Sequence, residues 1–101
     1  MEAWEYEIDI KKIAGFPSAK FRVTVKGETR TVHEVSLSEE YYRSLGEGEV
    51  PPEKLILFSF QFLLRREPNT AILSQFSLSD IARYFPEYEK VVRTAIARGE
   101  L

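Results

Sequence analysis

The chain has 101 residues, of which 44% are hydrophobic and 30% are charged, and its net charge is −2. This length and composition predict a single folded domain and exclude an intrinsically disordered chain. The absence of cysteine excludes disulfides and thiolate metal sites, and the near balance of charges provides no general attraction to nucleic acid or anionic lipid.

The N-terminal part alternates between apolar and charged residues, which is typical of half-buried strands. The first alternating segment, residues 4–10, carries an outward row of acidic side chains: Glu5, Glu7 and Asp9. The second, residues 20–26, carries an outward basic row: Lys20, Arg22 and Lys26. If the two strands pair antiparallel, opposite charges stabilise the pairing by about 0.2–1 kcal/mol each. We therefore interpret the acidic row as structural, and a metal or cationic-ligand site built from it is the alternative.

Residues 11–18 are expected to form a loop, because they include Gly15 and Pro17. The start of the chain is acidic and lacks the apolar stretch of a signal peptide, so none is expected.

A third strand is predicted at residues 29–35, after a tight turn at Gly27, which completes a three-stranded antiparallel meander. Val32 and Val35 have opposite parity, so we expect a bulge near His33 and Glu34. His33 is the only histidine in the chain. With no second histidine or cysteine beside it, a role as metal ligand or general base is not expected.

A short helix is predicted after this strand. Ser36 or Ser38 can cap its start, Ser36 and Glu39 have the spacing of a capping box, and Gly46 is a natural end. The following residues, 46–48, are expected to form a linker.

The most apolar segment lies between Pro51 and Pro68. Alternation of its phenylalanines with Ser59 and Gln61 leaves a strand open as an alternative, but its length and the prolines at its start favour a helix from about Glu53 to Arg66. Its apolar run is about half of the ~20 residues that a membrane span requires. Such a helix must be covered on several sides. If one phenylalanine is left uncovered, a second subunit becomes its natural cover, so a homodimer is possible through residues 55–64.

The remaining segments predict further helices. Asn69 or Thr70 can cap a brief helix through Phe76, and residues 77–80 form a second capping box. Pro86 ends the next helix, and a last amphipathic helix runs from Tyr88 toward Gly99. The predicted fold class is therefore α+β: one domain over residues 1–101, with a sheet at about 3–36 and a layer of four to five helices at about 37–98.

No residue pattern in the chain predicts catalysis. Nucleophilic catalysis needs a base beside a nucleophile, and the single histidine lies in a predicted strand. Paired-carboxylate chemistry needs two acids in a cleft, and the acids here alternate on predicted exposed faces. We expect a non-enzymatic protein without catalytic residues, cofactor or metal.

Five aromatic residues are the candidates for a protein interface: Tyr41, Tyr42, Tyr84, Phe85 and Tyr88. Tyrosine combines an apolar ring with a polar tip and is enriched in interfaces. For Phe85 and Tyr88, packing on the central helix is the alternative. The function predicted best is therefore a small protein-interaction or regulatory module.

The alternative function is DNA binding through a helix-turn-helix at about residues 78–98. Ala82 and Val92 are ten positions apart, close to the spacing of such motifs. Against it, Pro86 stands where glycine is usual, and Glu87 and Glu89 would face phosphates with the wrong charge.

Several phrases of the sequence resemble those of a group of small uncharacterised bacterial proteins. They are Val32–Val35, Phe60–Pro68, Ile72–Phe76 and Arg83–Glu89, within positions 20–92. The resemblance implies no activity; it implies a bacterial, cytoplasmic setting.

Overall fold

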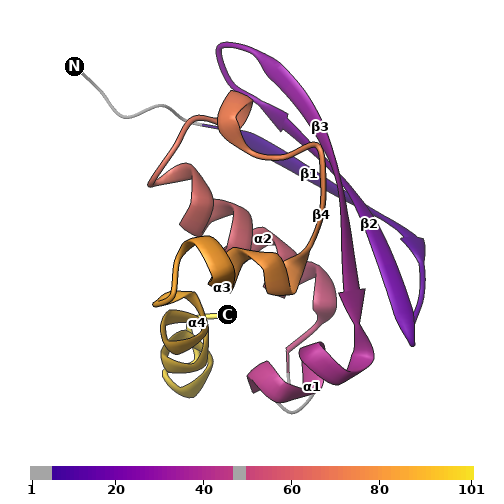
Figure 1. The fold of residues 1–101 in the computed structure, drawn as a ribbon, viewed down its shortest axis with the longest axis vertical. Helices are drawn as coiled ribbons and strands as arrows, with labels where there is room; N and C mark the ends of the chain where they lie inside the picture. The colour runs from indigo at the N-terminus through magenta and orange to yellow at the C-terminus, as the bar shows by residue number, and fades with distance from the viewer. Residues whose placement is uncertain (1–5, 47–49) are drawn as a thin grey trace.

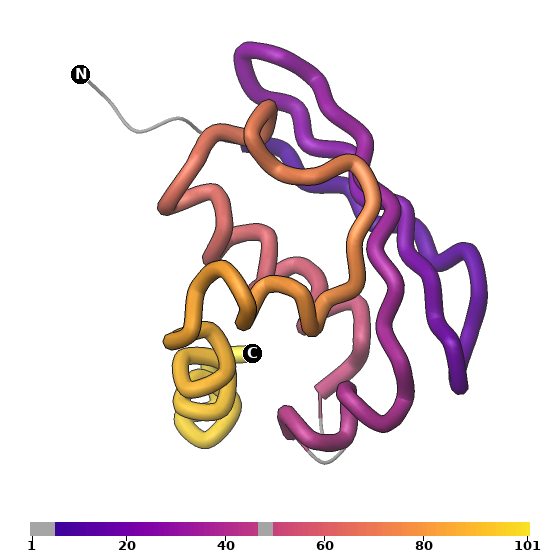
Figure 2. The backbone as a smooth tube through the Cα atoms, viewed as in Figure 1, coloured from indigo at the N-terminus to yellow at the C-terminus, as the bar shows by residue number. Residues whose placement is uncertain are grey.

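The computed structural model describes residues 6–46 and 50–101. A sheet forms one layer and the helices lie together against one of its faces (Figure 1). The tube in Figure 2 shows the chain crossing from the sheet to the helical layer after the third strand and touching the sheet again with a short segment near residue 76. The α+β fold class is confirmed, with four strands and four α-helices in the described residues.

The sheet has the order β1-β2-β3-β4. Its strands are β1 (Glu7–Ala14), β2 (Ser18–Lys26), β3 (Arg30–Ser38) and β4 (Gln75–Ser77). The first three form the predicted antiparallel meander. The inner face of β2 presents Phe21, Val23 and Val25, all fully buried, as the alternation predicts.

Two details of the predicted meander are wrong. Residues 11–14, expected in a loop, extend β1. The register is continuous through His33 and Glu34, and the irregularity lies in β1 between Lys12 and Ala14 instead. Because β3 has no bulge, His33 points into the core with 1% exposure and Val32 points out with 47%.

The charged rows of the outer face pair only in part as predicted. Glu7 stands opposite Lys26, but Asp9 faces Thr24. Within the described residues the ion pair of the sheet joins β2 to β3, where Lys20 Nζ lies 3.6 Å from Glu34 Oε2. Glu5 lies outside the described residues, as does most of the linker expected at 46–48.

The sheet differs from the predicted meander by its fourth strand. Residues 69–76, expected to form a helix, instead form a single turn of 3-10 helix, η1 (Asn69–Ala71), followed by β4. β4 pairs parallel to β3, with Val35 opposite Phe76. The Ser36 and Ser77 hydroxyls also hydrogen-bond across the pair at 2.8 Å. Ser36 therefore belongs to the sheet and does not cap a helix.

The helices are α1 (Glu39–Gly46), α2 (Pro52–Leu64), α3 (Ile81–Tyr84) and α4 (Tyr88–Ala97). Ser38 Oγ accepts the Tyr41 N–H at 3.1 Å and so caps α1. The second predicted capping box, between Ser77 and Asp80, is present. It opens a short 3-10 turn, η2 (Leu78–Asp80), that continues into α3.

Helix α2 is the predicted central helix, and it begins with Pro52 in its first turn. Phe60 is fully buried and Phe62 is 4% exposed, so the sheet and the other helices cover both. Phe58 is half-buried. No large apolar residue of this helix is exposed, so the condition that would require a second subunit as cover is not met.

Ser59, which interrupts the apolar run, is also fully buried in α2. Its hydroxyl donates to the Leu55 carbonyl at 2.8 Å, one turn earlier. The Tyr88 hydroxyl, 2.5 Å away, therefore donates to Ser59 Oγ. This pair joins α4 to the central helix within the core.

Candidate functional site

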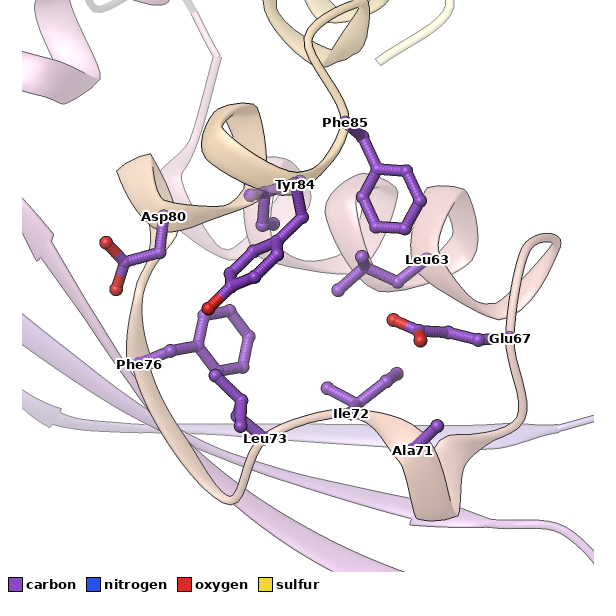
Figure 3. A pocket seen from close by; sticks show the side chains of 10 residues that line it. Leu63, Glu67, Ala71, Ile72, Leu73, Phe76, Asp80, Tyr84 and Phe85 are labelled. Carbon is purple, nitrogen blue, oxygen red and sulfur yellow. The ribbon is translucent and has the colours of Figure 1, made fainter.

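A groove opens where the C-terminal end of α2, η1, β4 and α3 meet (Figure 3). Its volume is about 230 Å³. The lining consists of Leu63, Glu67, Ala71, Ile72, Leu73, Phe76, Asp80, Ile81, Tyr84 and Phe85. Eight of these ten side chains are apolar or aromatic and two are carboxylates; none of the ten, which come from the described part of the chain, is a lysine, arginine or histidine.

The floor of the groove is part of the core, whereas its edges are open to solvent. Leu63 and Phe76, on the floor, are 4% and 9% exposed. Leu73 and Tyr84, at the edges, are 53% and 68% exposed. The described residues contain four exposed large hydrophobic side chains, and two of them therefore stand at this one groove. A concentration of this kind marks a contact surface more often than a single exposed residue does.

The Leu73 edge is held in place by the buried histidine. His33 Nδ1 lies 2.7 Å from the Leu73 carbonyl oxygen, so this ring nitrogen carries the proton and donates it. His33 Nε2 then accepts from the Thr31 hydroxyl at 2.8 Å. The segment is also tied to β3 by the Glu34 N–H, which donates to the Ser74 carbonyl at 2.8 Å. These bonds turn the Leu73 backbone toward the sheet and leave its side chain outside. His33 thus has a structural role.

Asn69 holds the turn that precedes this edge. It is 4% exposed, and its side-chain amide donates to the Thr29 carbonyl at 2.7 Å and to Thr31 Oγ1 at 2.9 Å. Asn69 or Thr70 is the predicted cap of a helix. Instead, the Asn69 side chain reaches back to the β2–β3 turn and fixes η1 against the sheet.

Arg66 contacts the aromatic rings of Phe62 and Phe85, of which Phe85 lines the groove. Its guanidinium lies 3.6 Å from the centre of the Phe62 ring and 5.9 Å from that of Phe85. It also pairs with Glu87, with Nε 3.4 Å from Oε2. Phe85 packs edge-on against Phe62, with ring centres 5.8 Å apart. The Phe85 ring therefore packs against α2, and Arg66, which is not part of the lining, is engaged by Glu87 and the Phe62 ring.

The two carboxylates of the lining lie on different sides of the groove. In Figure 3 the Glu67 carboxylate points from the connection after α2 toward the middle of the lining, whereas Asp80 lies across from it with its carboxylate directed away from the other side chains of the lining. Asp80 Oδ2 accepts the Ser77 N–H at 3.1 Å, and Oδ1 is 3.9 Å from Arg83 Nη1. Within the described residues, no lysine or arginine nitrogen lies within 4.0 Å of the Glu67 carboxylate. The groove thus has apolar walls and one carboxylate without a cation of its own.

The structure brings two of the five candidate interface residues to this groove, Tyr84 and Phe85. Tyr88 lies in the core with no exposed surface, its ring 5.3 Å from that of Phe62, centre to centre. This is the packing on the central helix that was the alternative for Tyr88. Burial raises the pKa of the Tyr88 phenol above its ordinary value.

Tyr41 and Tyr42 lie elsewhere, on α1, and both are half-buried. The Tyr41 hydroxyl donates to Glu89 Oε2 at 2.8 Å, and burial together with this bond raises the pKa of the phenol. The Tyr42 hydroxyl donates to the Val50 carbonyl, and its ring stacks on Phe16 with 4.9 Å between the ring centres. Burial also raises the pKa of Tyr42. Both tyrosines therefore join α1 to its neighbours.

Sequence reasoning missed Leu73 and Glu67 as members of the site. Leu73 carried no local signal, because it follows another apolar residue, Ile72, and its residue type is that of a core residue. Its exposure follows from the fold, in which Ile72 and Phe76 are buried and Leu73 is 53% exposed. Glu67 follows the central helix and carried no local signal.

A second cleft lies at the end of the sheet beside α1 and is rich in serine. Its hydroxyls are largely engaged within the fold: Ser36 with Ser77, and Ser38 with the start of α1. Lys20, at its edge, is paired with Glu34. The apolar groove is therefore the better candidate for a binding site.

The residues of the possible helix-turn-helix are placed as follows. Ala82 is half-buried in α3, which is only four residues long, and Val92 is fully buried in α4. At the start of α4, Glu87 pairs with Arg66, and Glu89 pairs with Arg93 at 3.8 Å. Each of the two glutamates at the start of this helix is therefore paired with an arginine.

The described part of the chain is an α+β domain with an apolar groove at one end of its central helix. Over residues 6–46 and 50–101, no three histidine, aspartate or glutamate side chains gather as a metal site would require. In the same residues, no helix combines the length and the apolarity needed to cross a membrane. Comparison of the chain with protein-family models, with curated proteins and with solved structures finds no match.

Proposed function

We propose that this protein is a non-enzymatic interaction module that binds a segment of another protein in the groove between α2, η1, β4 and α3. The observation that carries the proposal is the groove itself, with a buried apolar floor and two large exposed side chains, Leu73 and Tyr84, at its edges. A bacterial cytoplasmic setting is part of this proposal.

The size and the chemistry of the groove support a peptide segment as its occupant. Pockets for drug-sized molecules have volumes of roughly 300–1,000 Å³. The groove, at about 230 Å³, is smaller and suits one inserted side chain. Aromatic residues at the rim, such as Tyr84, supply contact area at a low cost in conformational entropy. A partner that seats one side chain on the floor would cover Leu73 and Tyr84 at the same time.

The proposal is tested by selecting binders from a library of random dodecapeptides displayed on phage. The selection uses the wild-type protein and counter-selects on the double variant Leu73→Ser with Tyr84→Ser. Both side chains are exposed, so the substitutions should change the free energy of unfolding by no more than about 0.5 kcal/mol each. We expect peptides that bind the wild type and lose at least about tenfold in affinity for the double variant.

The matched control removes the same kind of surface elsewhere. Ile13 and Val32 are 45% and 47% exposed on β1 and β3, away from the groove. The double variant Ile13→Ser with Val32→Ser should bind the selected peptides as the wild type does. The proposal is wrong if no peptide is enriched, or if the enriched peptides bind the Leu73 and Tyr84 double variant as tightly as the wild type.

A further inference from the structure

We infer that the bound segment inserts a lysine or arginine side chain into the groove, with its charged end on Glu67. The inference rests on the proposed binding function and adds the chemistry of the partner. It follows from two features of the groove: its apolar walls and the charge of the groups that line it.

The charged side chains that line the groove are all acidic. Among the described residues that line the groove, Glu67 and Asp80 are the only charged ones, and none is basic. The nearest arginine to Glu67 in sequence, Arg66, is engaged with Phe62 and Glu87. An acidic partner side chain would therefore meet like charge, and a neutral one would cover Glu67 without pairing it, which costs free energy.

The walls suit the stem of a basic side chain. Lysine and arginine bury their methylene groups along apolar surface and keep the charged end at a polar group. Leu63 and Ile72 lie on either side of the Glu67 carboxylate in Figure 3 and are 4% and 8% exposed. A stem that passes between them brings the cation to the carboxylate.

Tyr84 adds a second contact for a cation. Its ring reaches from α3 beside the groove in Figure 3 and is 68% exposed. A guanidinium or ammonium over an aromatic face gains about 0.5–1 kcal/mol at an exposed site. Asp80 is the weaker anchor of the two carboxylates, because it already caps η2 and lies 3.9 Å from Arg83.

The test uses the peptide that binds the wild-type groove most tightly and depends on Leu73 and Tyr84. Each basic residue of this peptide is replaced in turn, arginine by citrulline and lysine by norleucine, which keep the shape and remove the charge. Fluorescence anisotropy measures the affinity of each peptide for wild type and for Glu67→Gln. One replacement should weaken binding to the wild type about tenfold or more, as expected for a charge-assisted hydrogen bond. The same replacement should change binding to Glu67→Gln by less than about threefold.

The control is Glu100→Gln, which removes an exposed carboxylate outside the groove. It should leave the effect of the peptide replacement as in the wild type. The inference fails if groove-dependent peptides contain no basic residue, or if the neutral replacements weaken binding to the wild type and to Glu67→Gln equally. Absence of any groove-dependent peptide would instead remove the proposed function on which the inference rests.

A second copy of the chain is the other possible occupant. Sedimentation equilibrium of the wild type and of the Leu73 and Tyr84 double variant distinguishes it. We expect a monomer for both. A dimer that only the wild type forms would overturn the inference, because the groove would then be filled by the protein itself.

Discussion

At the scale of single residues, the fold depends on a few buried polar side chains that are fully hydrogen-bonded. Ser59, His33 and Asn69 are all buried, and each has partners that join segments far apart in sequence. Among the described residues, no buried side-chain nitrogen or oxygen lacks a partner. A buried polar group without a partner costs about 1–3 kcal/mol. Loss of a hydrogen-bond partner of any of these three residues should therefore destabilise the fold.

Asn69 provides the first prediction. Asn69→Ala removes the donors to the Thr29 carbonyl and Thr31 Oγ1 and leaves both acceptors with one partner fewer. We expect the free energy of unfolding, measured with urea, to fall by about 1–3 kcal/mol. Thr70→Ala, at the exposed neighbouring position, is the control and should change it by about 0.5 kcal/mol or less. Equal losses in the two variants would contradict the role assigned to Asn69.

Tyr88 provides a prediction of pH dependence. Burial raises the pKa of its phenol above the ordinary value of 10.0. The folded protein therefore keeps a proton that the unfolded chain releases above about pH 10. Stability from this group is complete below pH 10 and falls as the pH rises further, with a slope of up to about 1.4 kcal/mol per pH unit.

The measurement compares urea unfolding of wild type and Tyr88→Phe at pH 8 and pH 11. At pH 8 the variant should be about 0.5–1.5 kcal/mol less stable, because it lacks the bond to Ser59. At pH 11 the difference should shrink or reverse. A difference that stays constant between the two pH values would rule out a contribution of Tyr88 to the alkaline loss of stability.

At the scale of elements, the central helix organises the core. Phe60 lies under β3 and β4, with its ring centre 5.4 Å from that of His33 and 6.0 Å from that of Phe76. Phe58, two residues earlier, is only half-buried. Phe60→Ala should therefore lower the free energy of unfolding by about 3–5 kcal/mol, and Phe58→Ala by clearly less. Chemical denaturation measures both variants. Similar decreases in the free energy of unfolding would show that Phe58 is as well buried as Phe60, which contradicts this account of how the helix is covered.

The sequence predicted those elements in which an apolar pattern repeats over many residues. β2 and α4 each show a repeating apolar stripe, and the central helix is set by its apolar run between prolines. Short elements were less predictable. β4 has three residues, and its strand character comes from parallel pairing with β3, about forty positions away, which local propensity does not report.

The groove was the least predictable feature, for a physical reason. Its lining spans residues 63–85 and comes from the end of α2, η1, β4 and α3, segments that meet only in the folded chain. Tyr84 and Phe85 were candidates from their residue type, whereas Leu73 looked like an ordinary core residue. Whether such a side chain is covered depends on the tertiary arrangement.

At the scale of the whole molecule, the charge distribution bears on the alternative function. The net charge is −2, and Glu87 and Glu89 stand in or before the first turn of α4, where a recognition helix would meet DNA. We expect no change in anisotropy when fluorescent mixed-sequence duplexes are titrated with the protein at low salt. Binding that weakens steeply with added salt would contradict this expectation and favour DNA binding by residues 78–98.

The central claim is that the groove between α2, η1, β4 and α3 is the surface that binds a partner. The most direct measurement is the change in backbone amide NMR shifts when the ¹⁵N-labelled protein is titrated with the peptide selected most strongly on the wild type. We predict that the largest changes lie at Leu63, Glu67, Ile72, Leu73 and Tyr84. Changes concentrated instead on the outer face of the sheet, around Val32, would contradict the claim.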